Sequence, residues 1–252
     1  MTPMAQFEVK PLVPLHLGPY DVSFTNQAAW MFVVVGAAAL FYVFAAMRRS
    51  LVPTRMQSIA ELSYEFVDNM IRSVSGEAGL KFFPFVFAIF LFVLLSNFFG
   101  LIPGSFSITG QIAVTFALAF VVILTVIVTG FLVHGIGFLK LFVPKAPIYL
   151  LILLVPIEII SFFTRLISLS VRLFANMLGG HTLLKVFAAF IIALGATAVT
   201  AKPWFAPLSI APLFFEIAVY ALEFLIAFLQ AYVFAILTCI YLNEALHLHE
   251  HH

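Results

Sequence analysis

The feature that most constrains the fold is a series of long, nearly uninterrupted apolar segments. The longest runs from residue 148 to about residue 200, whereas a helix of about 20 residues already crosses the hydrocarbon core of a membrane. The chain is 64% apolar and only 9% charged, against about 45–50% and about 25% in soluble domains. Because the apolar runs are continuous rather than alternating, they predict helices and not a β-barrel. We therefore predict an all-α integral membrane protein.

The apolar segments predict five membrane crossings and one helix on the membrane surface. Residues 1–25 are polar and Pro-rich and predict an extramembrane arm, and residues 26–252 are expected to form a single helical membrane domain. No internal repeat is evident in this domain. The expected spans cover approximately residues 26–47, 82–102, 111–133, 148–200 and 208–242.

Residues 53–76 differ from the spans because charged side chains recur on one side of the expected helix. Glu61 and Asp68 belong to the polar side, and apolar residues occupy most of the other side. This pattern is typical of an amphipathic helix with too few apolar residues to cross a membrane. We predict a helix on the cytoplasmic surface, with Pro53 near its start and Gly76 at its end.

The segment 148–200 is too long for an upright span. A continuous helix of this length would reach about 80 Å, whereas the hydrocarbon core is about 30 Å thick. The segment is therefore either two spans or one strongly tilted helix, and Gly179–Gly180 is the only candidate turn. We favour one tilted helix that forms a hairpin with residues 208–242, which gives five crossings. Two spans would instead place the C-terminus outside.

Basic residues set the expected orientation. Arg48, Arg49 and Arg55 follow the first span, and Lys140 and Lys145 follow the third without an acidic residue between them. Loops rich in Lys and Arg stay on the cytoplasmic side. The N-terminus is therefore expected outside and the C-terminus in the cytoplasm.

Several classes of function find no support in the sequence. There is no basic tract for nucleic acid, no glycine-rich nucleotide loop and no nucleophile elbow, so we expect neither a catalytic residue nor a cofactor. The single Cys239 excludes a disulfide framework and predicts a small core residue. The tail from Asn243 onward holds His247, His249, His251 and His252. These could bind a metal weakly, but a polar disordered end is the better interpretation, and we expect no metal site.

Two of the apolar segments carry polar residues at seven-residue spacing. Seven residues are close to two helical turns, so each set lies near one helix face. Ser161, Ser168 and Asn176 fall near the first set. The two sets are Glu158, Arg165, Arg172 and Gly179, and Glu216, Glu223 and Gln230.

Arg172 is the most costly of these residues. An arginine at membrane depth costs about 2.5–3.5 kcal/mol. It could snorkel to headgroups, although apolar sequence extends far on both sides. The polar sets could also serve only as helix glue, with Glu158 pairing with Arg165 and Glu216 or Glu223 pairing with another cation. A proton relay accounts better for Glu, Arg and His181 together, because histidine accepts and releases protons near neutral pH.

At these residues the chain resembles subunit a of F-type ATP synthases, the stator subunit beside the proteolipid rotor ring. The resemblance extends over the chain from residue 26 and is weakest in the N-terminal arm. Asn97 lies in one of the matching motifs, and we expect it to form an interhelical hydrogen bond. The motifs are Ser168-Leu-Ser-Val-Arg172-Leu-Phe-Ala-Asn176-Met, Leu94-Leu-Ser-Asn97-Phe-Phe-Gly-Leu-Ile-Pro103, Leu229-Gln230-Ala-Tyr-Val-Phe and Tyr241-Leu.

The resemblance implies a role for each residue. Arg172 would be the essential arginine that faces a carboxylate of the ring. In some bacterial relatives the acid and the histidine are exchanged between the positions of Glu223 and His181, which suggests that these two residues touch. Gly100 stands where some relatives carry an acid, so no proton role is expected there. An outer half-channel would comprise Asn176, His181, Glu223 and Gln230, with Glu216 on the same stripe, and an inner half-channel would comprise Glu158, Ser161 and Ser168.

The resemblance implies a proton-conducting, non-catalytic subunit of the bacterial inner membrane. Its expected partners are the rotor ring of subunit c, b-type subunits of the peripheral stalk, the catalytic head through the complex, membrane lipids and protons. The alternative is a membrane subunit of another ion-coupled transporter or of a respiratory complex. A transporter would be expected to show paired repeats and broken helices, and neither is evident. Protons are favoured over sodium because His181 belongs to the outer half-channel.

Overall fold

The computed structural model describes residues 8–14, 16–17, 20–21, 23–47, 50, 52–102, 104–142, 147–200 and 210–246. Most of them are helical, as the apolar runs predicted. The helices are α1 (Asn26–Met47), α2 (Arg55–Ser75), α3 (Phe83–Leu101), α4 (Ile112–His134), α5 (Ile148–Thr200) and α6 (Ile210–Leu246). Two 3-10 helices, η2 (Gly76–Phe82) and η3 (Gly135–Phe142), follow α2 and α4.

Five helical stretches among the described residues are long and apolar enough to cross a membrane. They are Asn26–Met47, Arg55–Leu101, Ile112–Leu139, Tyr149–Ala196 and Pro212–Leu246. Large apolar side chains cover their outer surfaces: Leu132 and Ile152 are each 81% exposed. Such surfaces are unusual in water and suit a lipid environment. The chain is an all-α integral membrane protein, as predicted.

The N-terminal arm folds back on the start of α1. Strand β1 (Pro11–Val13) pairs antiparallel with β4 (Phe24–Thr25), and β2 (His16–Leu17) pairs with β3 (Tyr20–Asp21). The Asn26 side chain accepts a hydrogen bond from the Lys10 N–H at 3.0 Å and donates to the Glu8 carbonyl at 3.2 Å. These short strands were not predicted, because two or three residues show no periodicity.

The observed bounds of α2 agree with those expected for the amphipathic helix. Thr54 caps its N-terminus by accepting from the Gln57 N–H, and Gly76 ends it at a φ of 59°, where glycine is favoured. One face packs into the bundle through Val67, Met70 and Ile71.

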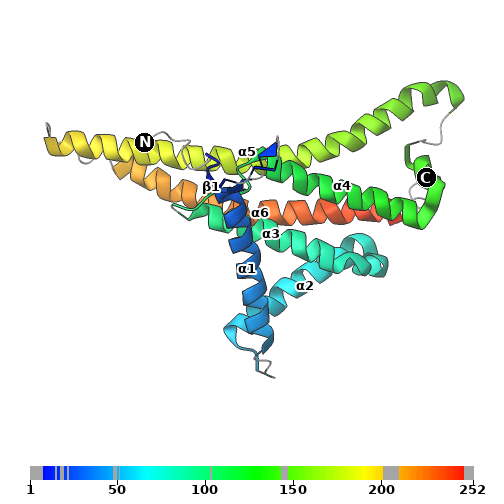
Figure 1. Ribbon diagram of the computed structural model, residues 1–252, viewed down its shortest axis with the longest axis horizontal. Helices are drawn as coiled ribbons and strands as arrows, with labels where there is room; N and C mark the ends of the chain where they lie inside the picture. Colours follow the sequence, from blue (N-terminus) through cyan, green and yellow to red (C-terminus); the bar gives the residue numbers. More distant parts are fainter. Residues whose placement is uncertain are drawn as a thin grey trace.

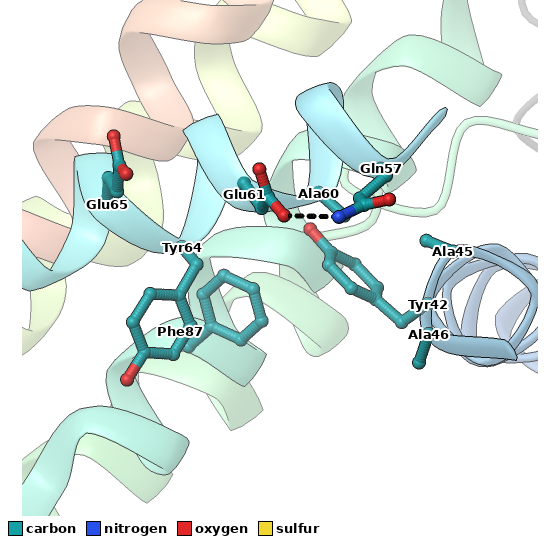
Figure 2. A pocket seen from close by; sticks show the side chains of 9 residues that line it. All are labelled: Tyr42, Ala45, Ala46, Gln57, Ala60, Glu61, Tyr64, Glu65 and Phe87. Atoms are coloured by element: carbon teal, nitrogen blue, oxygen red, sulfur yellow. Dashed lines mark hydrogen bonds between the residues drawn. The ribbon is translucent and has the colours of Figure 1, made fainter. Parts of the chain in front are cut away.

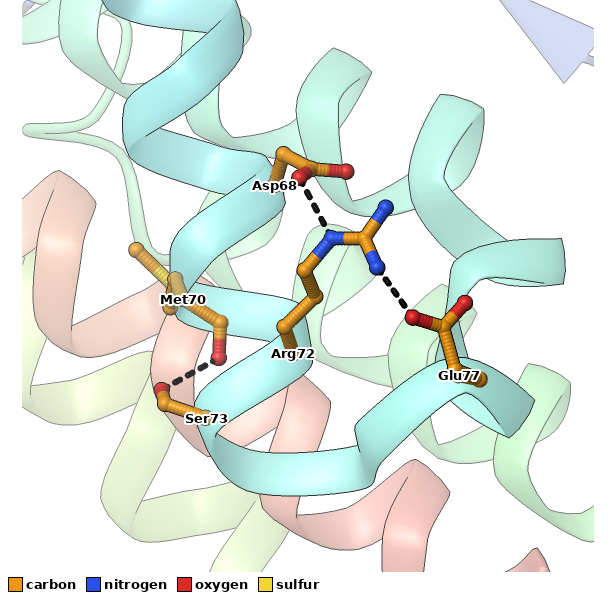
Figure 3. Close-up of polar contacts among 5 residues, drawn as sticks. All are labelled: Asp68, Met70, Arg72, Ser73 and Glu77. Atoms are coloured by element: carbon orange, nitrogen blue, oxygen red, sulfur yellow. Dashed lines mark hydrogen bonds and ion pairs between the residues drawn. The ribbon is translucent and has the colours of Figure 1, made fainter.

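An exposed charged network closes the C-terminal end of α2 (Figure 3). The Arg72 guanidinium donates to Asp68 at 2.7 Å and also pairs with Glu77 of η2. The hydrogen bond to Asp68 raises the pKa of Arg72. Exposed pairs of this kind contribute little to stability.

A groove of about 460 Å³ separates α1 from α2 (Figure 2). Gln57 and Glu61 form a hydrogen bond of 2.8 Å at its polar side. Tyr42 bridges the two helices, because its hydroxyl lies 2.6 Å from the Ser63 hydroxyl. Helix α1 buries little else in this chain, and Val34 and Ala45 are its buried residues.

Helix α5 is continuous over 53 residues, and Gly179–Gly180 does not interrupt it. The alternative of two separate spans is therefore wrong. In Figure 1, α5 extends along the longest dimension of the molecule, α6 lies beside it in the opposite direction, and α1 runs crosswise to both. Since α5 is far longer than the hydrocarbon is thick, it must be tilted. The predicted long hairpin is confirmed.

Two boundary predictions are wrong. Helix α6 continues to Leu246, whereas a polar tail was expected from Asn243. The added turn is held because Glu244 pairs with Arg165 and the Leu246 carbonyl accepts from the His134 imidazole at 3.1 Å. The segment after α4, expected as a loop, forms η3.

Some sequence-based predictions fall outside the described residues. These are the basic residues Arg48, Arg49 and Lys145, the side chain of Lys140 and the histidines from residue 247 onward. The connection between α5 and α6 at residues 201–209 is likewise outside them.

Helix α6 lies at the centre of the bundle and packs against α2, α3, α4 and α5. The core that these helices share contains Phe90, Phe234 and Leu169, each no more than 2% exposed. Cys239 belongs to this core, as predicted. The packing fixes how the polar residues at seven-residue spacing on α6 meet those on α5. We call each of these two sets a polar stripe.

Candidate functional site

Glu223 of α6 packs closely against α5 at Gly180. A Cβ atom built on Gly180 would overlap the Glu223 carboxylate, and even the Glu223 Cγ would lie 3.0 Å from it. Gly180 is therefore required for Glu223 to sit against α5. No atom lies within 4 Å of a Cβ built on Gly179. Of the two adjacent glycines, only Gly180 provides a close contact.

The carboxylate of Glu223 is buried in this contact. The residue is 7% exposed, and among the described residues neither carboxylate oxygen has a hydrogen-bond partner. Burying such a group without partners is costly. His181, 6% exposed, follows Gly180 directly in the chain. Glu223 thus packs against the glycine that precedes His181.

A cavity of about 270 Å³ lies beside His181 at the α3–α5–α6 junction. Its wall includes Gly100, Lys185, Glu216 and Tyr220, so it joins His181 to Glu216 of the second stripe. Sequence reasoning missed Lys185, although a lysine four residues after His181 shares its helix face. The Tyr220 hydroxyl donates to the Leu101 carbonyl at 3.2 Å and ties α6 to α3.

Arg172 lies on an exposed part of α5. Arg172, Asn176 and Ser168 are all exposed in this chain, and among the described side chains no carboxylate pairs with Arg172. Glu158 and Gln230 are half-buried. Among the predicted site residues, Glu223 and His181 are thus buried, with His181 beside the cavity, whereas Arg172, Asn176 and Ser168 are exposed.

Arg165 is paired across the hairpin rather than along its own helix. Its guanidinium forms an ion pair with Glu244 of α6 and lies 5.4 Å from the centre of the Tyr241 ring. The alternative pairing of Arg165 with Glu158 is wrong. Seven residues separate these two by about 10 Å along the helix, too far for direct contact, whereas α6 presents Glu244 beside Arg165.

Asn97 joins α3 to α6 one turn beyond Glu223. Its amide donates to the Ala227 carbonyl at 3.1 Å, and its carbonyl oxygen accepts from the Thr109 hydroxyl at 2.8 Å. The predicted interhelical hydrogen bond is confirmed. The partner Thr109 was not anticipated, because nothing in its local sequence places it near α3.

Comparison with known proteins decides the family. The family model described as "ATP synthase A chain" matches residues 28–243, which include all six helices nearly in full and every candidate site residue.

This chain belongs to the ATP synthase A chain family.

Curated relatives within this family match over nearly their whole length. ATP synthase subunit a of Mesorhizobium japonicum is 56% identical over 249 residues, covering 97% of this chain and 96% of the relative. The subunits a of Chelativorans sp. and Rhizobium meliloti are each 54% identical over 246 residues, covering 97% of both chains.

Proposed function

We propose that this chain is the proton-conducting stator subunit of an F-type ATP synthase membrane sector. The observation that carries the proposal is the placement of Arg172 on the open face of α5, without a carboxylate partner among the described side chains. A permanent charge there suits a carboxylate presented by a second protein. Membership of the ATP synthase A chain family supports the rotor ring of subunit c as that protein.

The buried groups fit the outer half-channel. Protons enter through the cavity beside Glu216, pass His181 and Glu223, and leave past Asn176 and Gln230 to a ring carboxylate. Glu223 packs against Gly180 and is 7% exposed, which supports a place for the acid away from lipid. The inner half-channel begins on the N-terminal half of α5, where Ser168, Ser161 and Glu158 follow one another along the helix.

Arg172 separates the two half-channels. Its guanidinium stays protonated at any working pH, so it attracts the ionised ring carboxylate and cannot relay a proton. The ring turns with the neutral acid facing lipid and releases the proton near Glu158. A membrane potential supplies about 2.3 kcal/mol per charge per 100 mV, and a leak past Arg172 would dissipate it without rotation.

The remaining parts of the proposal concern the complex and the membrane. The chain performs no chemistry on ATP, which belongs to a catalytic head held by b-type stalk subunits. It lies in a bacterial inner membrane with its N-terminus outside and its C-terminus in the cytoplasm. A ring and a head that co-purify with the chain would separate this proposal from another ion-coupled transporter or a respiratory complex.

The decisive variant is Arg172→Ala in membrane vesicles of the whole complex. We expect ATP-driven acidification to be lost and passive proton leak to rise, because the barrier between the half-channels is removed. Acidification and leak are both followed with a pH-sensitive dye, and immunoblots confirm assembly. Normal pumping by an assembled complex would show that the arginine is structural. If assembly fails, Arg172→Lys keeps the charge and is measured in the same way.

A further inference from the structure

The segment between α3 and α4 places a row of hydroxyl groups against the end of α3. Side chains of residues 105–109 alternate between polar and apolar, and all are buried. Phe106 and Ile108 pack against Val34 of α1. On the other side, the Ser105 hydroxyl donates to the Ile102 carbonyl at 2.7 Å. A connection buried in this way is unusual, because its polar groups need partners.

Ser107 is the member of this row that the bundle leaves without a partner. It is 0% exposed, and among the described residues its hydroxyl has no hydrogen bond. Thr109, two residues later, bonds to Asn97. Buried hydroxyl groups are nearly always hydrogen-bonded, to protein or to ordered water. The Ser107 hydroxyl therefore calls for a partner that is not a neighbouring side chain.

The hydroxyl of Ser107 and the imidazole of His181 flank the same point beside Gly100. A Cβ atom built on Gly100 would lie 3.4 Å from the Ser107 Oγ and 3.6 Å from the His181 Nε2. The absent side chain thus leaves two polar atoms, from two distant segments, facing one small space. A water in this space is the kind of partner that could hydrogen-bond to both.

The surroundings are suited to water. Gly100 and His181 both line the cavity of about 270 Å³, and a water occupies about 30 Å³ in the liquid. A buried water typically makes two to four hydrogen bonds. Ser107 and His181 supply two, and water in the cavity toward Lys185 and Glu216 supplies the rest.

We propose that Ser107 and His181 hold a water over Gly100 and that this water is a step of the outer half-channel. The proposal rests on the proposed function. An excess proton that arrives from outside along the cavity waters passes to the held water, which gives one of its own protons to Nε2 of the neutral imidazole. The imidazolium then releases a proton toward Glu223, and the held water is unchanged. Ser107 is a positioning residue that never gains or loses a proton overall.

Two small substitutions test whether a water is held beside Gly100. Gly100→Ala fits at van der Waals distance from its neighbours and fills the water's space, whereas Ser107→Ala removes one of its partners. We expect each to slow passive proton conduction about tenfold, in vesicles stripped of the catalytic head. Because both remove the same water, the double variant should be no slower than the slower single variant.

Matched controls use positions away from the cavity. Gly36→Ala adds a methyl group to α1, where no atom lies within 4 Å of the new Cβ. Ser75→Ala removes another buried serine, whose hydroxyl donates to the Cys239 carbonyl at 3.2 Å. Both should conduct at the parent rate.

Glu223→Gln serves as the reference for the half-channel itself. If Glu223→Gln blocks proton conduction but neither Gly100→Ala nor Ser107→Ala slows conduction, the proposed function stands and the proposal of a held water is overturned. Additive losses in the double variant would also overturn a shared water. If Glu223→Gln conducts normally, the proposed function fails and this proposal fails with it.

If the complex does not assemble with Ser107→Ala, a chemical probe tests the same position. Ser107→Cys in a Cys239→Ala background places a thiol at the proposed water, where silver ions added from the outside should block conduction. The Cys239→Ala background alone should remain insensitive. Insensitivity of the Ser107→Cys variant would show that water does not reach position 107 and would overturn the proposal.

Discussion

The contact between Gly180 and Glu223 shows how a single missing Cβ controls the site. The polar stripes indicated which residues carry chemistry, but not that one glycine admits the acid. Gly180 and Gly179 are adjacent and alike in sequence, yet only Gly180 faces α6. Replacing glycine by alanine should therefore disturb the contact with Glu223 at position 180 and leave it intact at position 179.

Gly180→Ala should displace the Glu223 carboxylate and slow ATP-driven proton pumping about tenfold or more, because overpacking costs about 1–3 kcal/mol. Pumping is measured per amount of assembled complex. Glu223→Asp, added to Gly180→Ala, shortens the acid by one methylene and should recover part of the rate. Gly195→Ala, on the same helix with no atom near its Cβ, is the control. Equal rates for both alanine variants would contradict the contact.

At the scale of elements, each end of the α5–α6 hairpin is attached differently. Near Glu223, Tyr220 and Asn97 tie α6 to α3 by hydrogen bonds. At the other end, Arg165 holds Glu244 and faces Tyr241. These contacts set the register in which Glu223 meets Gly180, since helices that pack along their length cannot shift at one point alone.

Arg165→Ala should destabilise the hairpin by about 1.5–3 kcal/mol, the range for a charged hydrogen bond within a protein. Thermal unfolding of the detergent-solubilised complex measures the loss. The exchanged pair, Arg165→Glu with Glu244→Arg, should recover most of it. Arg72→Ala removes the exposed pairs on α2 and should cost less than about 1 kcal/mol. An Arg165→Ala loss no greater than that of Arg72→Ala would rule out an anchoring role.

At the scale of the whole molecule, the length of α5 dictates the architecture. A helix of 53 residues fits a membrane only when tilted, and the tilt keeps a long polar stripe within the hydrocarbon. Arg172 is exposed on α5, whereas His181 of the same helix is buried. In the proposed function, one oblique helix would serve both half-channels.

The proposed orientation, with five crossings, puts the ends of the chain on opposite sides of the membrane. In a Cys239→Ala background, Glu8→Cys in the arm should react with an impermeant maleimide on intact spheroplasts. Glu77→Cys, 80% exposed after α2, should react only after lysis. Gel-shift labelling compares the two. The reverse pattern would overturn the proposed orientation, and labelling of both without lysis would place α2 outside.

The sequence by itself determined the membrane class, the long helices, the amphipathic α2 with the glycine that ends it, the polar stripes with Arg172 and Glu223, and His181 within an apolar segment. Hydropathy, periodicity and capping depend on consecutive residues, so they can be predicted locally. Only the tertiary structure decided the partner of Arg165, the closeness of Gly180 to Glu223 and the place of Ser107 beside His181. Each depends on which distant segments meet and at what register, and that is settled by packing around α6 rather than by neighbours in the chain.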